Sequence, residues 1–285
     1  MKIVHFLLLS LALIACESPK PKVPEKRVEP DKEAPQIRSE IDAFQKILEA
    51  NDVKGSILIF NPRINTYYSN NFDWAEKGRL PASTFKIPNT IVGLETGIVI
   101  SDTSVFIWDG EPRRMKQWEA NLSLREAFKY SCVPCYQEVA RKVGVDRMRL
   151  KMDSFNYGNM VFDSTTIDKF WLEGESKISQ FEQIEFLQKF NENHLAISER
   201  TKTLSKSIMF IDTLHEEASL YGKTGWSIRN GNNNGWFVGF LEFPNENFYF
   251  ATNIDPKENF NMDLFPKIRS QITMAAFDSL DVYSK

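Results

Sequence analysis

Apolar and polar residues follow two different periods along this chain, and the order of those periods predicts its fold. Between residues 37 and 48 the apolar positions recur every three or four residues, which predicts an amphipathic helix at the start of the domain. The apolar run over 55–60 then predicts a buried strand. Residues 64–69 predict its hairpin partner across the turn Asn61-Pro62-Arg63.

The middle of the chain, about 84–203, is dominated by helical spacing. Its first helix carries Lys86 and should end near Gly97, because glycine commonly caps helices. A capping box, Ser179-Gln-Phe-Glu182, predicts a later helix that runs to about Phe190. Three shorter helices are expected between these two, over 122–130, 136–143 and 147–155.

Strand patterns return in the last third of the chain. The expected strands cover 219–224, 235–243 and 248–254, and a last helix covers about 265–277. Asn230-Gly231 and Pro244-Asn245 mark turns, and the polar segment 227–234 is expected to be a mobile loop. This order of elements predicts an α+β fold, in which an antiparallel sheet is flanked by terminal helices and the helical region is inserted as one wall of a cleft.

Residues 1–36 do not share the pattern of the domain that follows. A basic start and a short apolar run predict a secretory signal over 1–15, too short to span a bilayer. The signal ends in Leu-Ile-Ala-Cys, which resembles the bacterial lipobox and predicts a lipidated Cys16; an ordinary cleaved signal with an incidental cysteine is the alternative. Residues 16–36 predict a disordered tether, since five prolines and ten charged residues fall between 17 and 36.

The predicted location and partners follow from these segments and from composition. We expect an exported lipoprotein at the periplasmic face of a bacterial membrane, with a soluble periplasmic protein as the alternative. Residues 37–285 form the domain, and a chain of 285 residues that is 42% hydrophobic can build a substantial core. The net charge of −3, with acids and bases interspersed, disfavours nucleic acid as a partner. An oligomer is compatible with the sequence and is not specified by it.

The cysteines and histidines predict no metal site. Cys132 and Cys135 lie in Cys-Val-Pro-Cys, a spacing that allows a local disulfide in an oxidising compartment or two thiols packed in a core. Four ligands for zinc are not available. Outside the signal the histidines are His194 and His215, which match no triad or metal spacing and are expected at the surface.

The first candidate for chemistry is the pair Ser83 and Lys86, at the start of the helix described above. Residues three apart on a helix share one face, so an amine would lie beside a hydroxyl. Phe85 and Ile87 make this helix apolar, and desolvation lowers the pKa of a lysine. A neutral lysine could take the serine proton. A buried helix whose lysine extends to solvent is the alternative, because Ser-x-x-Lys occurs in many helices.

Three further motifs give the pair a context. Ser131 supplies a second hydroxyl, and Tyr157-Gly158-Asn159 is expected in a loop. Lys223-Thr224-Gly225 ends a predicted strand, where Gly225 would let a ligand approach the backbone. Each motif is common alone, but this order is that of the serine acyl transferases and hydrolases that recognise penicillin.

The chain thus resembles the class D, or oxacillinase-type, serine β-lactamases over roughly residues 50–280. The stretches that carry the resemblance are 81–89 (PASTFKIPN), 93–97 (GLETG), 108–110 (WDG), 131–137 (SCVPCYQ), 157–159 (YGN), 170–174 (FWLEG), 221–226 (YGKTGW) and 235–239 (GWFVG). The resemblance implies a penicillin-recognising fold and hydrolysis of the β-lactam ring through a serine acyl-enzyme.

The resemblance also implies roles for individual residues. Ser83 would be the nucleophile, and Lys86, carboxylated by CO₂, would be the general base for both half-reactions. The Trp171 indole N–H would hydrogen-bond the carbamate, with a core aromatic as the alternative reading of Trp171. The apolar lining of this pocket would be Phe85, Val133, Trp171 and Leu172. Cys132, in place of an aliphatic residue, would lie next to it.

The substrate would be held and protonated by the other motifs. Ser131 would pass a proton to the leaving nitrogen, and Lys223 would keep the local potential positive and orient Ser131. Thr224 and an arginine would bind the substrate carboxylate; Arg269 resembles the family's arginine, and Arg229 is the alternative. Backbone N–H groups of Ser83 and Trp226 would form the oxyanion hole, and the loops around Trp118 and Trp226 would set substrate range.

Two other functions use the same motifs. A β-lactam sensor would be acylated at Ser83 without turnover, but such sensors carry several transmembrane helices before the domain. A cell-wall transpeptidase should lack the stretch around Trp171. The sequence therefore favours a hydrolase.

Overall fold

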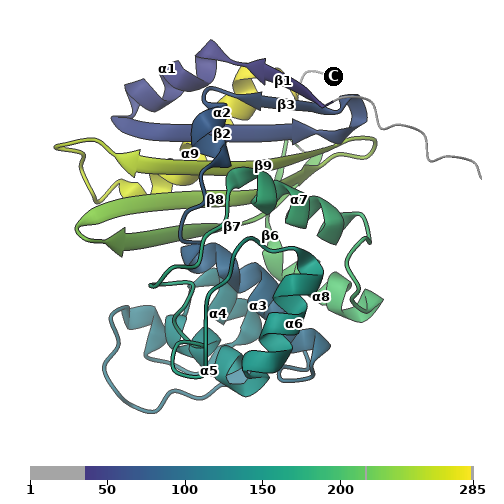
Figure 1. The fold of residues 1–285 in the computed structure, drawn as a ribbon, viewed down its shortest axis with the longest axis vertical. Helices are drawn as coiled ribbons and strands as arrows, with labels where there is room; N and C mark the ends of the chain where they lie inside the picture. Colours follow the sequence, from purple (N-terminus) through teal and green to yellow (C-terminus); the bar gives the residue numbers. More distant parts are fainter. Residues whose placement is uncertain (1–35, 216, 284–285) are drawn as a thin grey trace, which may run out of the picture. The chain divides into compact units, whose positions relative to one another are not determined.

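A seven-stranded sheet forms the centre of the fold in the computed structural model, which describes residues 36–215 and 217–283 (Figure 1). The predicted signal, the lipidated Cys16 and the tether up to residue 35 lie outside these ranges. The strands are β1 (Ile37–Glu40), β2 (Val53–Asn61), β3 (Thr66–Ser69), β6 (Phe210–Leu214), β7 (Ala218–Arg229), β8 (Asn232–Glu242) and β9 (Asn247–Pro256). Their spatial order is β1-β3-β2-β9-β8-β7-β6, and only the β1–β3 pair is parallel.

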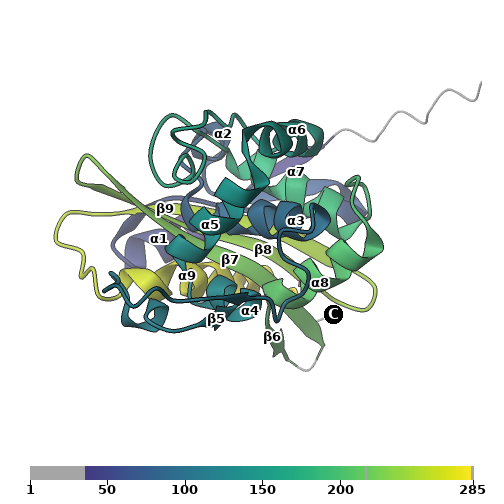
Figure 2. The same cartoon turned by 90° about the horizontal axis from the view of Figure 1, so that it is seen from below.

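Two hydrophobic layers cover the two faces of the sheet. On one face lie α1 (Asp42–Ala50) and α9 (Phe265–Ser279), which also contact each other. The other helices belong to the second layer: α2 (Phe72–Glu76), α3 (Lys86–Glu95), α4 (Leu124–Lys129), α5 (Val133–Val143), α6 (Val145–Phe155), α7 (Gln180–Asn191) and α8 (Glu199–Met209). Figures 1 and 2 show α3, α5 and α6 gathered beyond the β7 side of the sheet, which is the predicted inserted helical region.

The central strands have two buried faces, which explains their nearly continuous apolar sequences. In β8, Phe237 and Leu241 belong to the layer with α1 and α9, whereas Trp236, Val238 and Phe240 belong to the layer with the helical region. Successive side chains of a strand point to opposite faces. The predicted antiparallel sheet, terminal helices and inserted helices are therefore confirmed.

The edges of the sheet differ from the prediction. Residues 37–40, expected to begin the first helix, instead form β1 beside β3, and the helix begins at Asp42. The helical period continues from residue 41 onward. The residues before it pair with β3 at an open edge of the sheet. Strand β6 and helix α8 were not predicted as separate elements. A two-stranded ribbon, β4 (Val105–Phe106) with β5 (Leu122–Ser123), also takes the first residues of the helix expected over 122–130.

The segment 227–234 was predicted as a polar loop and is instead the end of a β-hairpin. Strands β7 and β8 stay paired as far as Arg229 and Asn232. They are joined by Asn230 and Gly231, which both have positive φ angles, 49° and 77°. Asn-Gly favours this tight turn because both residues tolerate a left-handed backbone. The hairpin thus extends β7 along the site described next. No helix of the described ranges is long and apolar enough to cross a bilayer.

Candidate active site

A cleft of about 480 Å³ lies where α9, strand β7, the turn between α4 and α5, and a short 3-10 helix, η2 (Ala82–Phe85), meet. Eight of the residues that the sequence predicted for the site line it: Ser83, Trp118, Ser131, Val133, Leu172, Thr224, Trp226 and Arg269. Its rim includes Arg114 and Met115, which sequence reasoning did not identify, and Ile228, which belongs to the predicted segment 227–234. These three carry no motif and reach the cleft only because of the fold. The other predicted residues, Lys86, Trp171, Lys223 and Gly225, lie around the cleft.

Ser83 and Lys86 are joined by a hydrogen bond. The Lys86 Nζ donates to Ser83 Oγ at 2.9 Å. Ser83 lies in η2 and Lys86 at the first position of α3, so the pair spans a 3-10 turn and not an α-helical one. Side chains three apart eclipse in a 3-10 helix, which brings the amine directly over the hydroxyl. The predicted proximity is present, with a tighter turn than predicted.

The Lys86 side chain is wholly buried, with 0% exposure. Burial lowers the pKa of Lys86 well below its ordinary value, and the nearby charge of Lys223 lowers it further. The ammonium lies 5.4 Å from the centre of the Tyr136 ring. Within the described residues Lys86 has no acidic partner, so its surroundings favour the neutral amine.

Trp171 packs against Phe85, the residue that precedes Lys86. Its ring is fully buried and stacks on Phe85 with 5.1 Å between ring centres. The Trp171 carbonyl accepts a hydrogen bond from the Ala82 N–H at 2.8 Å, which ties this segment to η2. The indole Nε1–H is buried and has no hydrogen-bond partner in the described part of the chain. A buried donor without an acceptor is energetically costly. We therefore infer that this N–H donates to an acceptor that the described residues do not supply.

Lys223 lies on β7, just past the point where β6 stops pairing with that strand at Tyr221. Burial, with a smaller effect from the charge of Arg269, lowers the pKa of Lys223 to about 7. Its ammonium donates to the Thr224 carbonyl at 3.2 Å and lies 5.5 Å from the centre of the Phe128 ring. No hydrogen bond to Ser131 is among those of Lys223 in the described ranges, so a direct orienting contact stays a prediction.

The two candidate arginines have different surroundings. Arg269 is buried, lines the cleft, and donates to three backbone carbonyls, of Phe265 (3.0 Å), Pro266 (2.9 Å) and Gly225 (2.5 Å). Burial lowers the pKa of Arg269 to about 10. It has no carboxylate partner among the described residues, so its charge is available to a ligand. Arg229 is not among the residues that line the cleft and instead forms an ion pair with Glu175 at 2.6 Å.

Gly225 lies in close contact with η2 and the residue before it. A Cβ at this position would lie 3.1 Å from Thr84 Cγ2 and 3.2 Å from the Pro81 carbonyl oxygen. The missing side chain therefore makes room for η2, and a closer approach of a ligand at Gly225 stays a prediction. Close packing of β7 on η2 sets the distance between Ser83 and the strand that carries Lys223 and Thr224.

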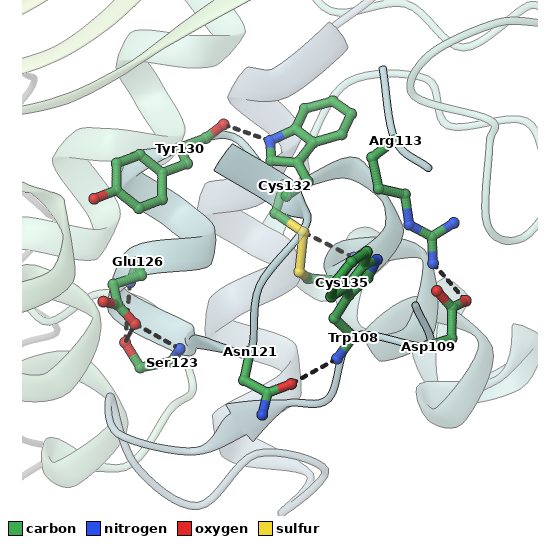
Figure 3. Close-up of a disulfide and its surroundings, with 10 residues drawn as sticks. Trp108, Asp109, Arg113, Asn121, Ser123, Glu126, Tyr130, Cys132 and Cys135 are labelled. Carbon is green, nitrogen blue, oxygen red and sulfur yellow. Dashed lines mark hydrogen bonds and ion pairs between the residues drawn. A yellow bond between two sulfur atoms is a disulfide. The ribbon is translucent and has the colours of Figure 1, made fainter. Parts of the chain in front are cut away.

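The paired cysteines form a disulfide, which decides between the two readings left open by the sequence (Figure 3). The bridge lines a small cavity of about 120 Å³ that also borders Trp108 and Trp118. Trp118 in turn lines the main cleft, and its Nε1–H donates to the Tyr130 carbonyl at 3.0 Å.

The remaining predictions concern the two histidines, a metal site and the residues that set substrate range. His194 is exposed, and the His215 ring packs on Tyr283. Neither histidine lines the cleft, and no cluster of potential metal ligands occurs in the ranges that the structure covers. Trp226 is held by a hydrogen bond from its Nε1–H to Asn233 Oδ1 at 2.9 Å and lies across the cleft rim.

Comparisons with known proteins agree on one group. Residues 50–272 match the family described as the penicillin binding protein transpeptidase domain. The beta-lactamase OXA-10 of Pseudomonas aeruginosa is 39% identical over 237 residues, which cover 82% of this chain and 88% of that relative. The beta-lactamase OXA-48 of Klebsiella pneumoniae is 37% identical over 219 residues, covering 77% of this chain and 82% of that relative.

Solved structures give the same result. The class D beta-lactamase from Sebaldella termitidis ATCC 33386 has a TM-score of 0.82 and 34% identity, covering 87% of this chain and 99% of that chain. The class D beta-lactamase YbXI from Nostoc has a TM-score of 0.77 and 38% identity, covering 82% of this chain and 98% of that chain.

Proposed function

The chain belongs to the class D β-lactamases, and from that premise we propose how its own residues hydrolyse the β-lactam ring. Membership confirms the resemblance inferred from the motifs, and with it a serine hydrolase that inactivates β-lactam antibiotics. The observation that carries the mechanism is the Ser83–Lys86 hydrogen bond of a buried lysine, together with the buried Trp171 indole N–H, which has no partner among the described residues.

Ser83 attacks the β-lactam carbonyl, and the base carried by Lys86 takes the Ser83 proton; the 2.9 Å contact between Lys86 Nζ and Ser83 Oγ places the two side chains side by side. We propose that Lys86 is carboxylated in the active enzyme. Two features of the pocket fit CO₂: burial favours the neutral amine that can take it up, and Trp171 Nε1–H can donate to the resulting anion. When bound, CO₂ converts the amine to a carbamate, which supplies a base for acylation and for the attacking water.

Ser131 then passes its proton to the nitrogen that leaves when the ring opens. Ser131 and Ser83 both line the cleft, so a ring bound there lies between the two hydroxyls. Lys223, buried behind Thr224, keeps the potential of this region positive. A positive potential stabilises the negative charge that develops on the carbonyl oxygen, for which we assign the backbone N–H groups of Ser83 and Trp226 as donors.

The cleft also suits the common parts of a penicillin-type substrate. Arg269 and Thr224 are the proposed partners of the substrate carboxylate, because Arg269 is a cleft-lining cation without a carboxylate partner in the described chain. Val133, Leu172 and Trp226 supply an apolar wall for the substrate side chain. Substrate range within the β-lactams depends on the rim residues, such as Met115 and Ile228.

Turnover of a chromogenic β-lactam tests this function. The purified protein should hydrolyse many equivalents per active site, and Ser83→Ala should hydrolyse none. A single stoichiometric burst that leaves a stable adduct on Ser83 would instead identify a β-lactam sensor, the alternative function. Oligomeric state can be read from the same preparation by light scattering.

We also propose, from residues 1–36, that the protein is exported and tethered to a membrane by lipid on Cys16. The support is the apolar run that ends in Leu-Ile-Ala-Cys and the charged, proline-rich stretch after it. Wild-type protein should fractionate with bacterial membranes, and Cys16→Ser should appear in the soluble or unprocessed fraction. Equal membrane association of the two would contradict lipidation.

A further inference from the structure

The turn that carries Ser131 has an unusual backbone. Ser131 has a φ of 54°, a left-handed conformation that residues with a Cβ adopt rarely. It follows α4, and the Ser131 N–H donates to Phe128 O at 3.1 Å while the Cys132 N–H donates to Ala127 O at 2.8 Å. These two bonds define a Schellman motif, whose left-handed position is usually glycine. A serine here is unfavourable for the backbone, so neighbouring contacts must hold the turn.

Cys132 is also the first residue of the next structural unit. It is the N-cap of α5, and its Sγ accepts a hydrogen bond from the Cys135 N–H at 3.3 Å. Sulfur is a weak acceptor, which makes cysteine a poor cap by hydrogen bonding alone. The disulfide links the same two residues covalently, with 5.5 Å between their Cα atoms. The first turn of α5 is therefore closed by a bond where a serine or aspartate would normally close it.

The turn is fixed from its other side as well. Figure 3 shows the Tyr130 carbonyl accepting from an indole N–H, that of Trp118. Ser131 thus lies between Tyr130, held by Trp118, and Cys132, held by the disulfide. Both cysteines are buried, and a bridge across a sequence separation of three residues closes a very small loop. Such a loop constrains the unfolded chain little, so its main effect is expected on local geometry.

We propose that the Cys132–Cys135 disulfide is a positioning element for Ser131: it holds the strained α4–α5 turn so that the Ser131 hydroxyl faces the cleft. The inference rests on the proposed function, because it assigns the effect to the proton transfer by Ser131. Reducing the bridge loosens the turn and slows that step, while the substrate carboxylate is still bound by Thr224 and Arg269 on the other wall.

Reduction of the bridge is a balanced two-electron reaction. A dithiol such as dithiothreitol attacks one sulfur through its thiolate, and the S–S bond breaks. The second thiol of the reductant then closes its own ring. Cys132 and Cys135 become thiols by gaining two electrons and two protons, and the reductant becomes a cyclic disulfide. A small cavity of about 120 Å³ borders both cysteines.

The test compares the full-length protein in its oxidised and reduced states, with thiols at 132 and 135 verified by alkylation and peptide mass analysis after the assay. We expect reduction to lower kcat about tenfold, within the roughly 100-fold that a 1 Å misplacement of a reacting group can cost. KM should stay within about twofold, because groups on the other wall bind the carboxylate. The variant Cys132→Ala with Cys135→Ala should reproduce the reduced enzyme without any reductant.

Ser131→Ala separates positioning from general loosening. If the bridge acts through the Ser131 hydroxyl, reduction should not change the residual kcat of Ser131→Ala. An unchanged kcat in reduced wild-type protein would overturn the inference, and so would an equal fractional loss in Ser131→Ala. Absence of turnover in the oxidised wild-type protein would instead overturn the proposed function on which the inference depends.

Discussion

Replacing Trp171 with Phe removes one N–H and keeps an aromatic ring in the pocket. Trp171 is fully buried and stacked on Phe85, and its Nε1–H has no partner in the described chain. If that N–H donates to a carbamate on Lys86, its loss should weaken carboxylation specifically. The substitution therefore tests the assignment of Lys86 as a carboxylated base.

The size of the effect follows from the kind of hydrogen bond. A hydrogen bond to a charged group contributes about 1.5–3 kcal/mol. Since every 1.4 kcal/mol is a factor of ten, the affinity of Trp171→Phe for CO₂ should fall roughly 10- to 150-fold. The fold should suffer less, because the substitution also removes a buried donor that costs about 1–3 kcal/mol when it is unpaired in the uncarboxylated protein.

Carbon-13 NMR of protein equilibrated with labelled bicarbonate measures carboxylation, and the bicarbonate dependence of kcat measures its consequence. Trp236→Phe is the matched control, since Trp236 is equally buried but its Nε1–H donates to the Leu80 carbonyl at 3.0 Å. That variant should lose stability and keep the wild-type bicarbonate dependence. A wild-type bicarbonate dependence in Trp171→Phe would refute the assignment.

Three further predictions concern pH, substrate binding and packing. The pH profile of kcat/KM without added bicarbonate should be bell-shaped: activity falls at low pH as Lys86, whose pKa is depressed, becomes protonated, and falls above about pH 7 as Lys223 loses its charge. Bicarbonate should shift the alkaline limb of this profile to higher pH, because an anion at position 86 favours charged Lys223. An alkaline limb at the same pH with and without bicarbonate would contradict this coupling. Arg269→Ala should raise KM roughly 10- to 150-fold, the equivalent of about 1.5–3 kcal/mol for a charged hydrogen bond, while Arg229→Ala stays near wild type; the reverse order would show that the carboxylate site is wrong. Gly225→Ala should lower kcat and thermal stability together, because the added methyl group would lie 3.1–3.3 Å from atoms of η2 and its N-terminal neighbour. An unchanged Tm would show that η2 can shift to accommodate the methyl group without loss of stability.

Much of the fold and most of the site could be predicted because they are encoded locally. The order of the motifs around Ser83, Ser131 and Lys223 predicted residues that the fold does gather around one cleft. The continuous apolar runs of β8 and β9 and the capping box at Ser179 could likewise be recognised, because each depends on residues close together in sequence.

Features that depend on distant partners could not be predicted. The strand β1 exists because β3 offers it an open edge, which overrides the helical period that begins near it. The reason for Gly225 became visible only when η2 was placed against β7. The pairing of Arg229 with Glu175, which favours Arg269 as the partner of the substrate carboxylate, involves a residue from another segment of the chain.

Two further features also depend on packing. The Trp171 N–H has no partner among the described residues, and the two cysteines are close enough to form a disulfide. A single sequence shows that a tryptophan and two cysteines are present, but not which of their atoms lack or find a partner. Those two features carry the carboxylation proposal and the further inference, respectively.

The intact mass of the protein during turnover tests the central claim most directly. Lys86→Ala and wild-type protein are each mixed with excess β-lactam at saturating bicarbonate and sampled over time. We predict that wild-type protein hydrolyses many equivalents with little persistent adduct. Any covalent adduct in Lys86→Ala should have the mass of the substrate, map to Ser83 and fail to clear. Clearance by Lys86→Ala at the wild-type rate, or an adduct on another residue, would contradict the account.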